Sequence, residues 1–216
     1  LEPSRIVVVA GHGADVVEAG ALDWNPMTQV VLQKEQLGTA HAVAQAKDIL
    51  GSFEGNAIVL YGDTPFISAQ TLEAMIDARA TADVVVLGFD AEDPATYGRL
   101  VMDGDSLERI VEFKDASPQE RRISLCNSGV VCADAKVLFE LIEAVGNDNA
   151  SGEYYLTDIV SIARQSGRSA GIVICDEEET MGVNSRAELA RAEAIFQNFK
   201  RLEAFDNGVT LQAPDA

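Results

Sequence analysis

The sequence predicts an α/β protein with a mostly parallel, mixed sheet that carries helices on both faces. Short apolar segments rich in β-branched residues alternate with amphipathic segments along the chain, which is the pattern of strands joined by helical crossovers. Two alternating segments around Asp103-Gly104-Asp105 indicate a hairpin, which adds antiparallel strands. A length of 216 residues suits one domain with a full-sized core.

The first half of the chain opens with a strand over residues 5–10, whose continuous apolar run is typical of a strand buried on both faces. Gly11-His12-Gly13 then turns the chain. Ser68 is a suitable N-cap for a helix that places Leu72 and Met75 on one side. The other elements expected in this half are a strand over 29–33, a helix over 39–50 and a strand over 57–61.

The second half continues the alternation and ends in a capped helix. Ser185 and Glu188 form a capping box that opens this last helix, and its apolar face is Leu189, Ala192, Phe196 and Phe199. The elements expected before it are a strand over 82–89, hairpin strands over 97–102 and 107–112, a strand over 125–132, a helix through Leu138, Leu141, Ile142 and Val145, a helix over 155–165 that stops at Gly167, and a strand over 170–175.

Charge and cysteine content restrict the class of protein. The chain has 16 Lys and Arg against 35 Asp and Glu, a net charge of −19, which argues against nucleic acid or anionic membranes as partners. Its 3 cysteines form no C-x-x-C pair, so we expect free thiols in a reducing compartment. No apolar run approaches the roughly 18 residues of a membrane span, and the start lacks the basic residues of a signal peptide. The expected location is the cytoplasm.

Tyr61-Gly62-Asp63 is the first candidate site, because open α/β sheets bind ligands at the carboxyl ends of their strands. Glycine lets a phosphate or sugar approach the backbone closely. A lone aspartate suits Mg²⁺, which prefers few carboxylates together with substrate phosphates. An equally good interpretation is that Asp63 only caps the turn before Pro65.

The other candidates each have an ordinary structural interpretation. The segment from Gln33 to Thr39 leads into a helix N-terminus that could face an anion or a base carbonyl, but the pattern alone favours a loop capped by Thr39. Glu112 pairs with Lys114 as surface charges often do. Asn127 in an apolar strand and Asn184 before the last helix could serve only structural hydrogen bonds. We expect a loop role for His12 and a structural role for His41, and we find no catalytic triad, zinc spacing or P-loop.

The order of these weak signals is specific. They are Gln33-x-x-Gln36-Leu37-Gly38-Thr39-x-His41-Ala42, Tyr61-Gly62-Asp63-x-Pro65, Tyr97-Gly98-Arg99, Val111-Glu112-x-Lys114-Asp115-Ala116, Asn127-x-Gly129, Gly152-Glu153-Tyr154-Tyr155-x-Thr157-Asp158 and Gly182-Val183-Asn184. From about Arg5 to its end the chain resembles the uridylyltransferase domain of the bacterial N-acetylglucosamine-1-phosphate uridylyltransferases. The motif at residues 152–158 distinguishes these uridylyltransferases from the sugar-phosphate thymidylyltransferases, which share the fold.

The resemblance implies a Rossmann-like nucleotide-diphospho-sugar transferase fold and a Mg²⁺-dependent enzyme of cell-envelope (peptidoglycan and lipopolysaccharide) precursor synthesis. UTP and N-acetylglucosamine 1-phosphate would give UDP-N-acetylglucosamine and pyrophosphate. By resemblance, Asp63 is catalytic and holds the metal with Asn184. The substrate-binding residues implied are Gln33, Gly38 and Thr39 on the uracil side, and Tyr61, Gly62, Gly98, Glu112, Asn127 and Asn184 around the sugar and ribose.

One part of the family pattern does not occur in these 216 residues: a first strand and loop like Leu-Ala-Ala-Gly-x-Gly-Thr-Arg-Met, with a later Pro-Lys. We therefore expect residues 1–206 to form a uridylyltransferase domain without its N-terminal strand and phosphate loop, and residues 207–216 to lead toward a further, absent domain. The activity of this chain alone then stays open. Either the native protein is longer or it is a degenerate relative.

Three alternatives to this activity stay open: a nucleotidyltransferase for another sugar 1-phosphate, a non-catalytic nucleotide-sugar-binding domain, and a structural domain with a vestigial site. Self-association into a homo-oligomer also stays open.

Overall fold

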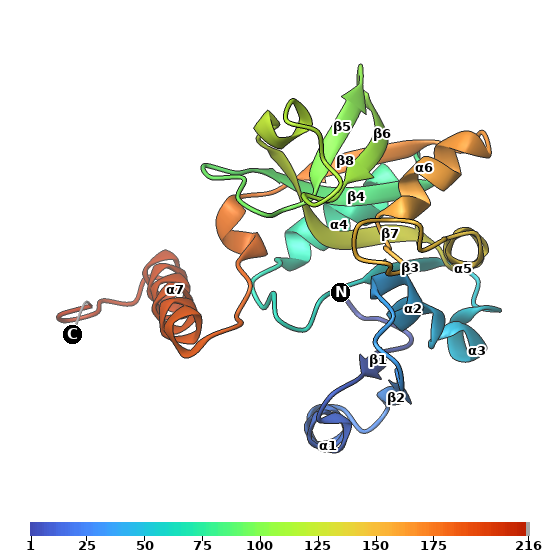
Figure 1. Ribbon diagram of the computed structural model, residues 1–216. Helices are drawn as coiled ribbons and strands as arrows, with labels where there is room; N and C mark the ends of the chain where they lie inside the picture. Colours follow the sequence, from blue (N-terminus) through green and yellow to red (C-terminus); the bar gives the residue numbers. More distant parts are fainter. Residues whose placement is uncertain (215–216) are drawn as a thin grey trace.

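The computed structural model describes residues 1–214 and is built around one mixed sheet (Figure 1). The last two residues of the predicted exit segment 207–216 lie outside the described residues. The main sheet has the order β6-β5-β7-β4-β8, and β3 also pairs with β7. Its strands are β3 (Asn56–Val59), β4 (Val84–Asp90), β5 (Arg99–Asp103), β6 (Ser106–Val111), β7 (Leu125–Asp134) and β8 (Ala170–Ile174). A separate two-stranded sheet pairs β1 (Val7–Ala10) with β2 (Gln29–Leu32).

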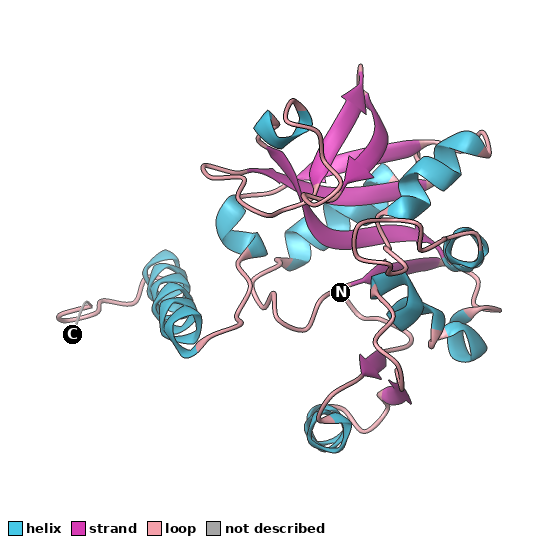
Figure 2. Cartoon of the chain, viewed as in Figure 1, coloured by secondary structure: helices cyan, strands magenta, loops and turns pink. Residues whose placement is uncertain are grey.

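Helices alternate with these strands, as the sequence predicts (Figure 2). They are α1 (Ala14–Trp24), α2 (Thr39–Ala44), α3 (Lys47–Leu50), α4 (Ala69–Ala78), α5 (Ala135–Glu143), α6 (Asp158–Gln165) and α7 (Arg186–Asp206), with 3₁₀ turns η1 (Glu120–Arg122) and η2 (Glu177–Thr180). Within the described part of the chain, no helix is long and apolar enough to cross a membrane.

Strand β4 shows why the sheet is covered on both faces. Val84 and Val86 belong to the core cluster that contains the apolar residues of α5 and α6, whereas Val85 and Leu87 pack with Leu72 and Met75 of α4. All four β4 side chains are fully buried. Because successive strand residues point to opposite faces, a continuous apolar run needs helices on both sides. The predicted α/β class with a mixed sheet is confirmed.

The expectation of a mostly parallel sheet needs correction. Only β1–β2 and β4–β8 pair in parallel among the described strands, while β7 runs antiparallel to β3, β4 and β5. The crossover through α4 does leave β3 and β4 pointing the same way, but β7 inserts between them in the opposite direction. Alternation of strands and helices indicates the crossovers, but it does not report which strand later enters between two parallel ones.

Several helices differ from what the sequence predicts. Helix α1 was not predicted, since it starts after Gly13 without a side-chain cap and buries no residue, which leaves no cap or apolar stripe to detect. The helix expected over 39–50 is broken into α2 and α3 around Gln45 and Ala46. Helix α6 begins at Asp158 rather than residue 155, because the backbone N–H groups of Tyr154 and Leu156 donate to Leu37 before α2 and to Thr39 at its start.

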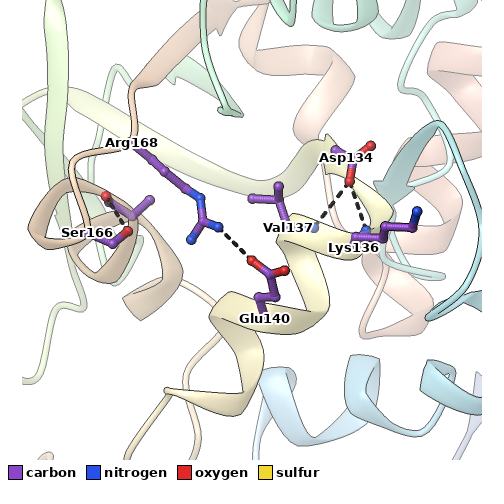
Figure 3. A network of polar contacts seen from close by, with 7 residues as sticks. Asp134, Lys136, Val137, Glu140, Ser166 and Arg168 are labelled. Atoms are coloured by element: carbon purple, nitrogen blue, oxygen red, sulfur yellow. Dashed lines mark hydrogen bonds and ion pairs between the residues drawn. The ribbon is translucent and has the colours of Figure 1, made fainter.

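Helix α5 illustrates how local sequence fixes an element boundary (Figure 3). Asp134 ends β7 and accepts hydrogen bonds from the backbone N–H groups of Lys136 (3.0 Å) and Val137 (3.2 Å), as an N-cap does. Arg168 then donates to Glu140 at 2.6 Å, which ties α5 to the segment after α6. This pair is solvent-accessible, so it contributes less to stability than the cap.

Helix α7 projects from the body of the molecule (Figure 1). Ser185 accepts a hydrogen bond from the Glu188 N–H at 3.2 Å, as the predicted capping box requires, and the Glu188 carboxylate accepts from the Asn184 N–H at 2.7 Å. Of the predicted apolar face only Ala192 is buried, whereas Leu189, Phe196 and Phe199 are exposed; Phe199 lies with its ring 6.0 Å from that of Phe66. The predicted cysteine state is also confirmed, since Cys126, Cys132 and Cys175 are all free.

Candidate active site

Asp63 and Asn184 come together although 120 residues separate their segments. Asp63 follows β3, and Asn184 precedes α7. The Val183 N–H donates to the Asp63 carbonyl oxygen at 2.8 Å. A Cβ placed on Gly182 would lie 3.3 Å from Asn184 Nδ2 and 3.9 Å from Asp63 Oδ2, so both side chains border the same glycine. The predicted pair of metal ligands is therefore brought to one place.

Tyr61 packs against Gly129 from β7. A Cβ on Gly129 would lie 2.2 Å from Cε2 of the tyrosine ring, and Gly129 has a φ of +90°, so only glycine fits here. Burial raises the pKa of Tyr61 to about 12; the carboxylates of Glu112 and Asp63 add to the rise, and a hydrogen bond with Thr39 opposes it. The phenol therefore stays protonated at neutral pH and can donate a hydrogen bond toward a ligand.

A bulge in β7 produces the close contact at Gly129. The pairing of β4 with β7 shifts between Val86, opposite Val131, and Gly88, opposite Asn127. The residues in between leave the regular ladder, and the Ser128 hydroxyl donates to the Leu87 carbonyl oxygen at 2.8 Å. Bulges commonly re-aim side chains beside functional sites.

Asn127 and Gly98 are joined at the end of the sheet that carries Glu112. The Asn127 N–H donates to the Gly98 carbonyl oxygen at 2.9 Å, and the Asn127 side-chain oxygen accepts from the Gly129 N–H at 3.0 Å. A Cβ on Gly98 would lie 3.5 Å from both Glu112 carboxylate oxygens. Gly98, Glu112 and Asn127 thus lie together, as the resemblance implies.

Glu112 is a half-buried carboxylate whose orientation is fixed by Thr157. The Thr157 hydroxyl donates to Glu112 Oε1 at 3.0 Å. Burial raises the pKa of Glu112; the Thr157 hydrogen bond lowers it, and the nearby Asp115 and Asp158 carboxylates raise it. A cavity of about 220 Å³ adjoins this carboxylate and is lined by Ile110, Val111, Glu112, Asp115, Asp148, Asn149, Tyr155 and Asp158.

The loop from Gln36 to Thr39 is held by the segment 154–156. The Tyr154 N–H donates to the Leu37 carbonyl at 2.8 Å, the Ala40 N–H donates to the Tyr154 carbonyl at 2.9 Å, and the Leu156 N–H donates to Thr39 Oγ1 at 2.8 Å. A Cβ on Gly38 would lie 2.5 Å from the Tyr154 carbonyl oxygen, so glycine is required for this approach.

Gln33 supports the same loop from the other side. Its side-chain nitrogen donates to the Gly38 carbonyl at 3.1 Å and lies 3.0 Å from His41 Nδ1, and the residue is buried. His41 also contacts Gln45 at 3.3 Å, which fits the predicted structural role of this histidine. His12 lies exposed in the turn after β1, as predicted.

The structure identifies two residues that the sequence reasoning did not assign. Thr157 orients the Glu112 carboxylate. It belongs to the motif at residues 152–158, but the sequence analysis gave it no role. Glu179 accepts hydrogen bonds from the Ser68 N–H and the Thr71 hydroxyl, and no spacing rule pointed to it. A larger hollow of about 400 Å³ lies between α4 and β8 beside Glu179, and none of the predicted site residues lines it.

The sequence matches a known family, and it is similar to known proteins over its whole length. The model of the nucleotidyl transferase family matches residues 7–179. The chain is 63% identical over 215 residues to the bifunctional protein GlmU of Ruegeria pomeroyi, covering 100% of this chain and 48% of that protein. It is 61% identical to the protein of the same name from Cereibacter sphaeroides, covering 100% of this chain and 47% of that protein. The chain spans about half the length of the curated relatives it matches, and the identities confirm the resemblance over the whole chain.

Solved structures show the same fold at low identity. UDP-glucose pyrophosphorylase complexed with UDP-glucose matches with a TM-score of 0.61 and 17% identity, over 78% of this chain and 72% of that one. HddC from Yersinia pseudotuberculosis matches with a TM-score of 0.56 and 20% identity, over 79% of this chain and 69% of that one. The predicted nucleotide-diphospho-sugar transferase fold is confirmed.

Proposed function

The chain belongs to the nucleotidyl transferase family, and from this premise we propose that it transfers UMP from UTP to N-acetylglucosamine 1-phosphate. The products are UDP-N-acetylglucosamine, a cell-envelope precursor, and pyrophosphate. The ordered motifs support this substrate pair, and relatives named GlmU support it through identities above 60%. UTP is an abundant cytoplasmic nucleotide, so we also propose a cytoplasmic location.

The reaction is a single displacement at phosphorus. A phosphate oxygen of the sugar phosphate bonds to the α-phosphorus of UTP, and the bond from that phosphorus to the oxygen bridging the β-phosphate breaks as pyrophosphate leaves. Such a transfer depends on positioning and on stabilising charge rather than on a covalent nucleophile. A histidine base is not needed, and His41 is engaged with Gln33 and Gln45.

The chain would bind the uracil with one group of residues, and the sugar and the ribose with another. Gln33, Gly38 and Thr39 would contact the uracil from the loop held by Tyr154. The sugar and ribose would meet Tyr61, Gly62, Gly98, Glu112, Asn127 and Asn184. The protonated Tyr61 phenol and the Glu112 carboxylate supply a donor and an acceptor, respectively, in the same space, which suits a polyhydroxylated ligand.

Asp63 and Asn184 are suitable partners for Mg²⁺. One carboxylate and one amide oxygen match its preference for oxygen ligands and leave positions for phosphate oxygens and water. Both side chains border Gly182, whose missing Cβ leaves space between them. Among residues 1–214 no cluster of three or more His, Cys, Asp or Glu could hold a metal alone, so the substrate would supply the other ligands. When bound, the ion would neutralise phosphate charge.

The proposal rests on a connected set of contacts that runs from the loop at residues 36–39, on the uracil side, to Glu112 on the sugar side. Thr39 accepts from the Leu156 N–H, and the next residue, Thr157, donates to Glu112. Tyr61 packs against Gly129, and the Gly129 N–H donates to the Asn127 side-chain oxygen at 3.0 Å on the sugar side. A ligand with a base at one end and a sugar at the other fits this arrangement.

The test is product identification with a panel of sugar 1-phosphates. The full-length protein is incubated with UTP, Mg²⁺ and the 1-phosphates of N-acetylglucosamine, glucosamine or glucose, and products are identified by mass. We expect UDP-N-acetylglucosamine to form at least tenfold faster than the others. Preference for another sugar would change the substrate assignment, and binding of UDP-N-acetylglucosamine without turnover would indicate the non-catalytic alternative.

A further inference from the structure

The segments 63–68 and 179–184 run side by side in opposite directions and are tied at both ends. At one end, the Val183 N–H donates to the Asp63 carbonyl oxygen at 2.8 Å. At the other, Glu179 Oε2 accepts from the Ser68 N–H at 2.8 Å. Ser68 lies five residues after Asp63, and Glu179 lies five residues before Asn184. The two ties therefore enclose the region in which Asp63 and Asn184 meet.

The tie at Glu179 is the stronger end of this arrangement. Its Oε2 also accepts from the Thr71 hydroxyl at 2.7 Å, and Thr71 is only 8% exposed. Hydrogen bonds to an ionised acceptor are stronger than neutral ones. The carboxylate also lies at the N-terminus of α4, a helix of 10 residues, where the helix dipole favours negative charge. A charged and directed contact of this kind fixes the position of η2 against α4.

Asn184 follows the residues that Glu179 ties to α4. Asn184 is exposed and stands at the start of α7, which projects away from the sheet (Figure 1). The segment from Glu179 to Asn184 includes Gly182, whose backbone is free to take several conformations. With Glu179 released, the backbone hydrogen bond from Val183 would remain at this crossing, together with the packing of Phe199 from α7 on Phe66.

We propose that Glu179 is a positioning residue that holds Asn184 in register with Asp63 and thereby sets the affinity of the site for a divalent cation. This inference rests on the proposed function, in which Asp63 and Asn184 bind the metal. Residues that orient metal ligands typically change metal affinity by about 10- to 100-fold when they are replaced. Glu179 is expected to act in this range without touching the ion.

The experiment compares Glu179→Ala and Glu179→Gln with Glu178→Ala. Glu178 lies in the same 3₁₀ turn, is exposed, and loses the same charge without contacting α4. Mn²⁺ binding is measured by electron paramagnetic resonance in the presence of UDP-N-acetylglucosamine, and folding is checked by urea unfolding. We expect Mn²⁺ affinity to fall roughly tenfold or more in Glu179→Ala, to fall less in Glu179→Gln, which keeps an acceptor, and to be unchanged in Glu178→Ala.

A double-mutant cycle with Asn184→Ala separates positioning from general loosening. If Glu179 acts through Asn184, Glu179→Ala will cause no further loss of Mn²⁺ affinity in the Asn184→Ala background. Equal losses in both backgrounds would overturn the inference, as would matching affinities for Glu179→Ala and Glu178→Ala. Thr71→Val removes the second donor and should weaken Mn²⁺ binding in the same direction. If the wild-type protein binds no Mn²⁺ with UDP-N-acetylglucosamine, the proposed metal site itself fails, and the inference fails with it.

Discussion

Replacing Gly129 by alanine should displace Tyr61, and the size of the effect can be worked out from two separate costs. A Cβ at residue 129 would lie 2.2, 2.8 and 2.9 Å from three ring carbons of Tyr61, closer than non-bonded carbons approach. The φ of +90° adds backbone strain for any residue with a side chain. The strain amounts to about 1–2 kcal/mol, and overpacking adds about 1–3 kcal/mol. We expect the free energy of unfolding to fall by about 2–5 kcal/mol.

Gly167→Ala provides the matched control for this prediction. Gly167 has a φ of +78°, and a Cβ there would meet no atom within 4 Å. Gly167→Ala therefore introduces the backbone strain without a steric clash. Urea unfolding should give a loss of about 1–2 kcal/mol for Gly167→Ala and a clearly larger loss for Gly129→Ala. In a Tyr61→Ala background the cost of Gly129→Ala should fall to the strain alone. Equal losses for the two glycine variants would refute the packing of Tyr61 on residue 129.

Four further substitutions test other residues of the site. Burial raises the pKa of Glu112, so the folded protein keeps its proton to a higher pH than the unfolded chain, and stability falls as pH rises from the ordinary value of 4.5 through the folded pKa. Urea unfolding of Glu112→Gln should lack this fall, while its KM for the sugar phosphate rises roughly tenfold or more; an identical pH profile would contradict the burial of this carboxylate. Asp63→Asn should abolish Mg²⁺-dependent pyrophosphate release, and Asn184→Ala should raise the Mg²⁺ concentration that gives half-maximal rate. If the rates of both variants depend on Mg²⁺ as the wild-type rate does, neither residue is a metal ligand. Gly38→Ala should raise the KM for UTP, since its Cβ would meet the Tyr154 carbonyl oxygen at 2.5 Å, and a KM unchanged from wild type would show that the loop adapts.

Local signals were sufficient for most elements of the fold. The N-caps at Ser68 and Ser185 and the hairpin turn at Gly104 were predictable because each depends on residues within four positions of one another. The direction of β7 could not be predicted, because it depends on pairing between strands that are far apart in the chain. Helix α1 has neither a side-chain cap nor a buried face, so no local signal marked it.

The candidate site shows the same division between local and distant information. Gln33, Gly38, Tyr61, Glu112 and Asn127 were proposed as site residues through the order of short motifs. The structure places Gln33 against Gly38, and both Tyr61 and Asn127 against Gly129. The role of Thr157 in fixing Glu112 depends on a contact across 45 positions, and that of Glu179 on contacts across 108 and 111 positions. Such partners leave no spacing pattern, so only the folded chain reveals them.

In the proposed function, one continuous site binds a uracil on the Thr39 side and a sugar on the Glu112 side. Isothermal titration of UDP and of UDP-N-acetylglucosamine into the wild-type protein, Thr39→Val and Glu112→Gln tests it most directly. We predict that Thr39→Val weakens both ligands, while Glu112→Gln weakens UDP-N-acetylglucosamine by roughly tenfold or more and leaves UDP unchanged, since a hydrogen bond to a charged group contributes about 1.5–3 kcal/mol. Equal effects of Glu112→Gln on the two ligands, or no effect on either, would contradict the account.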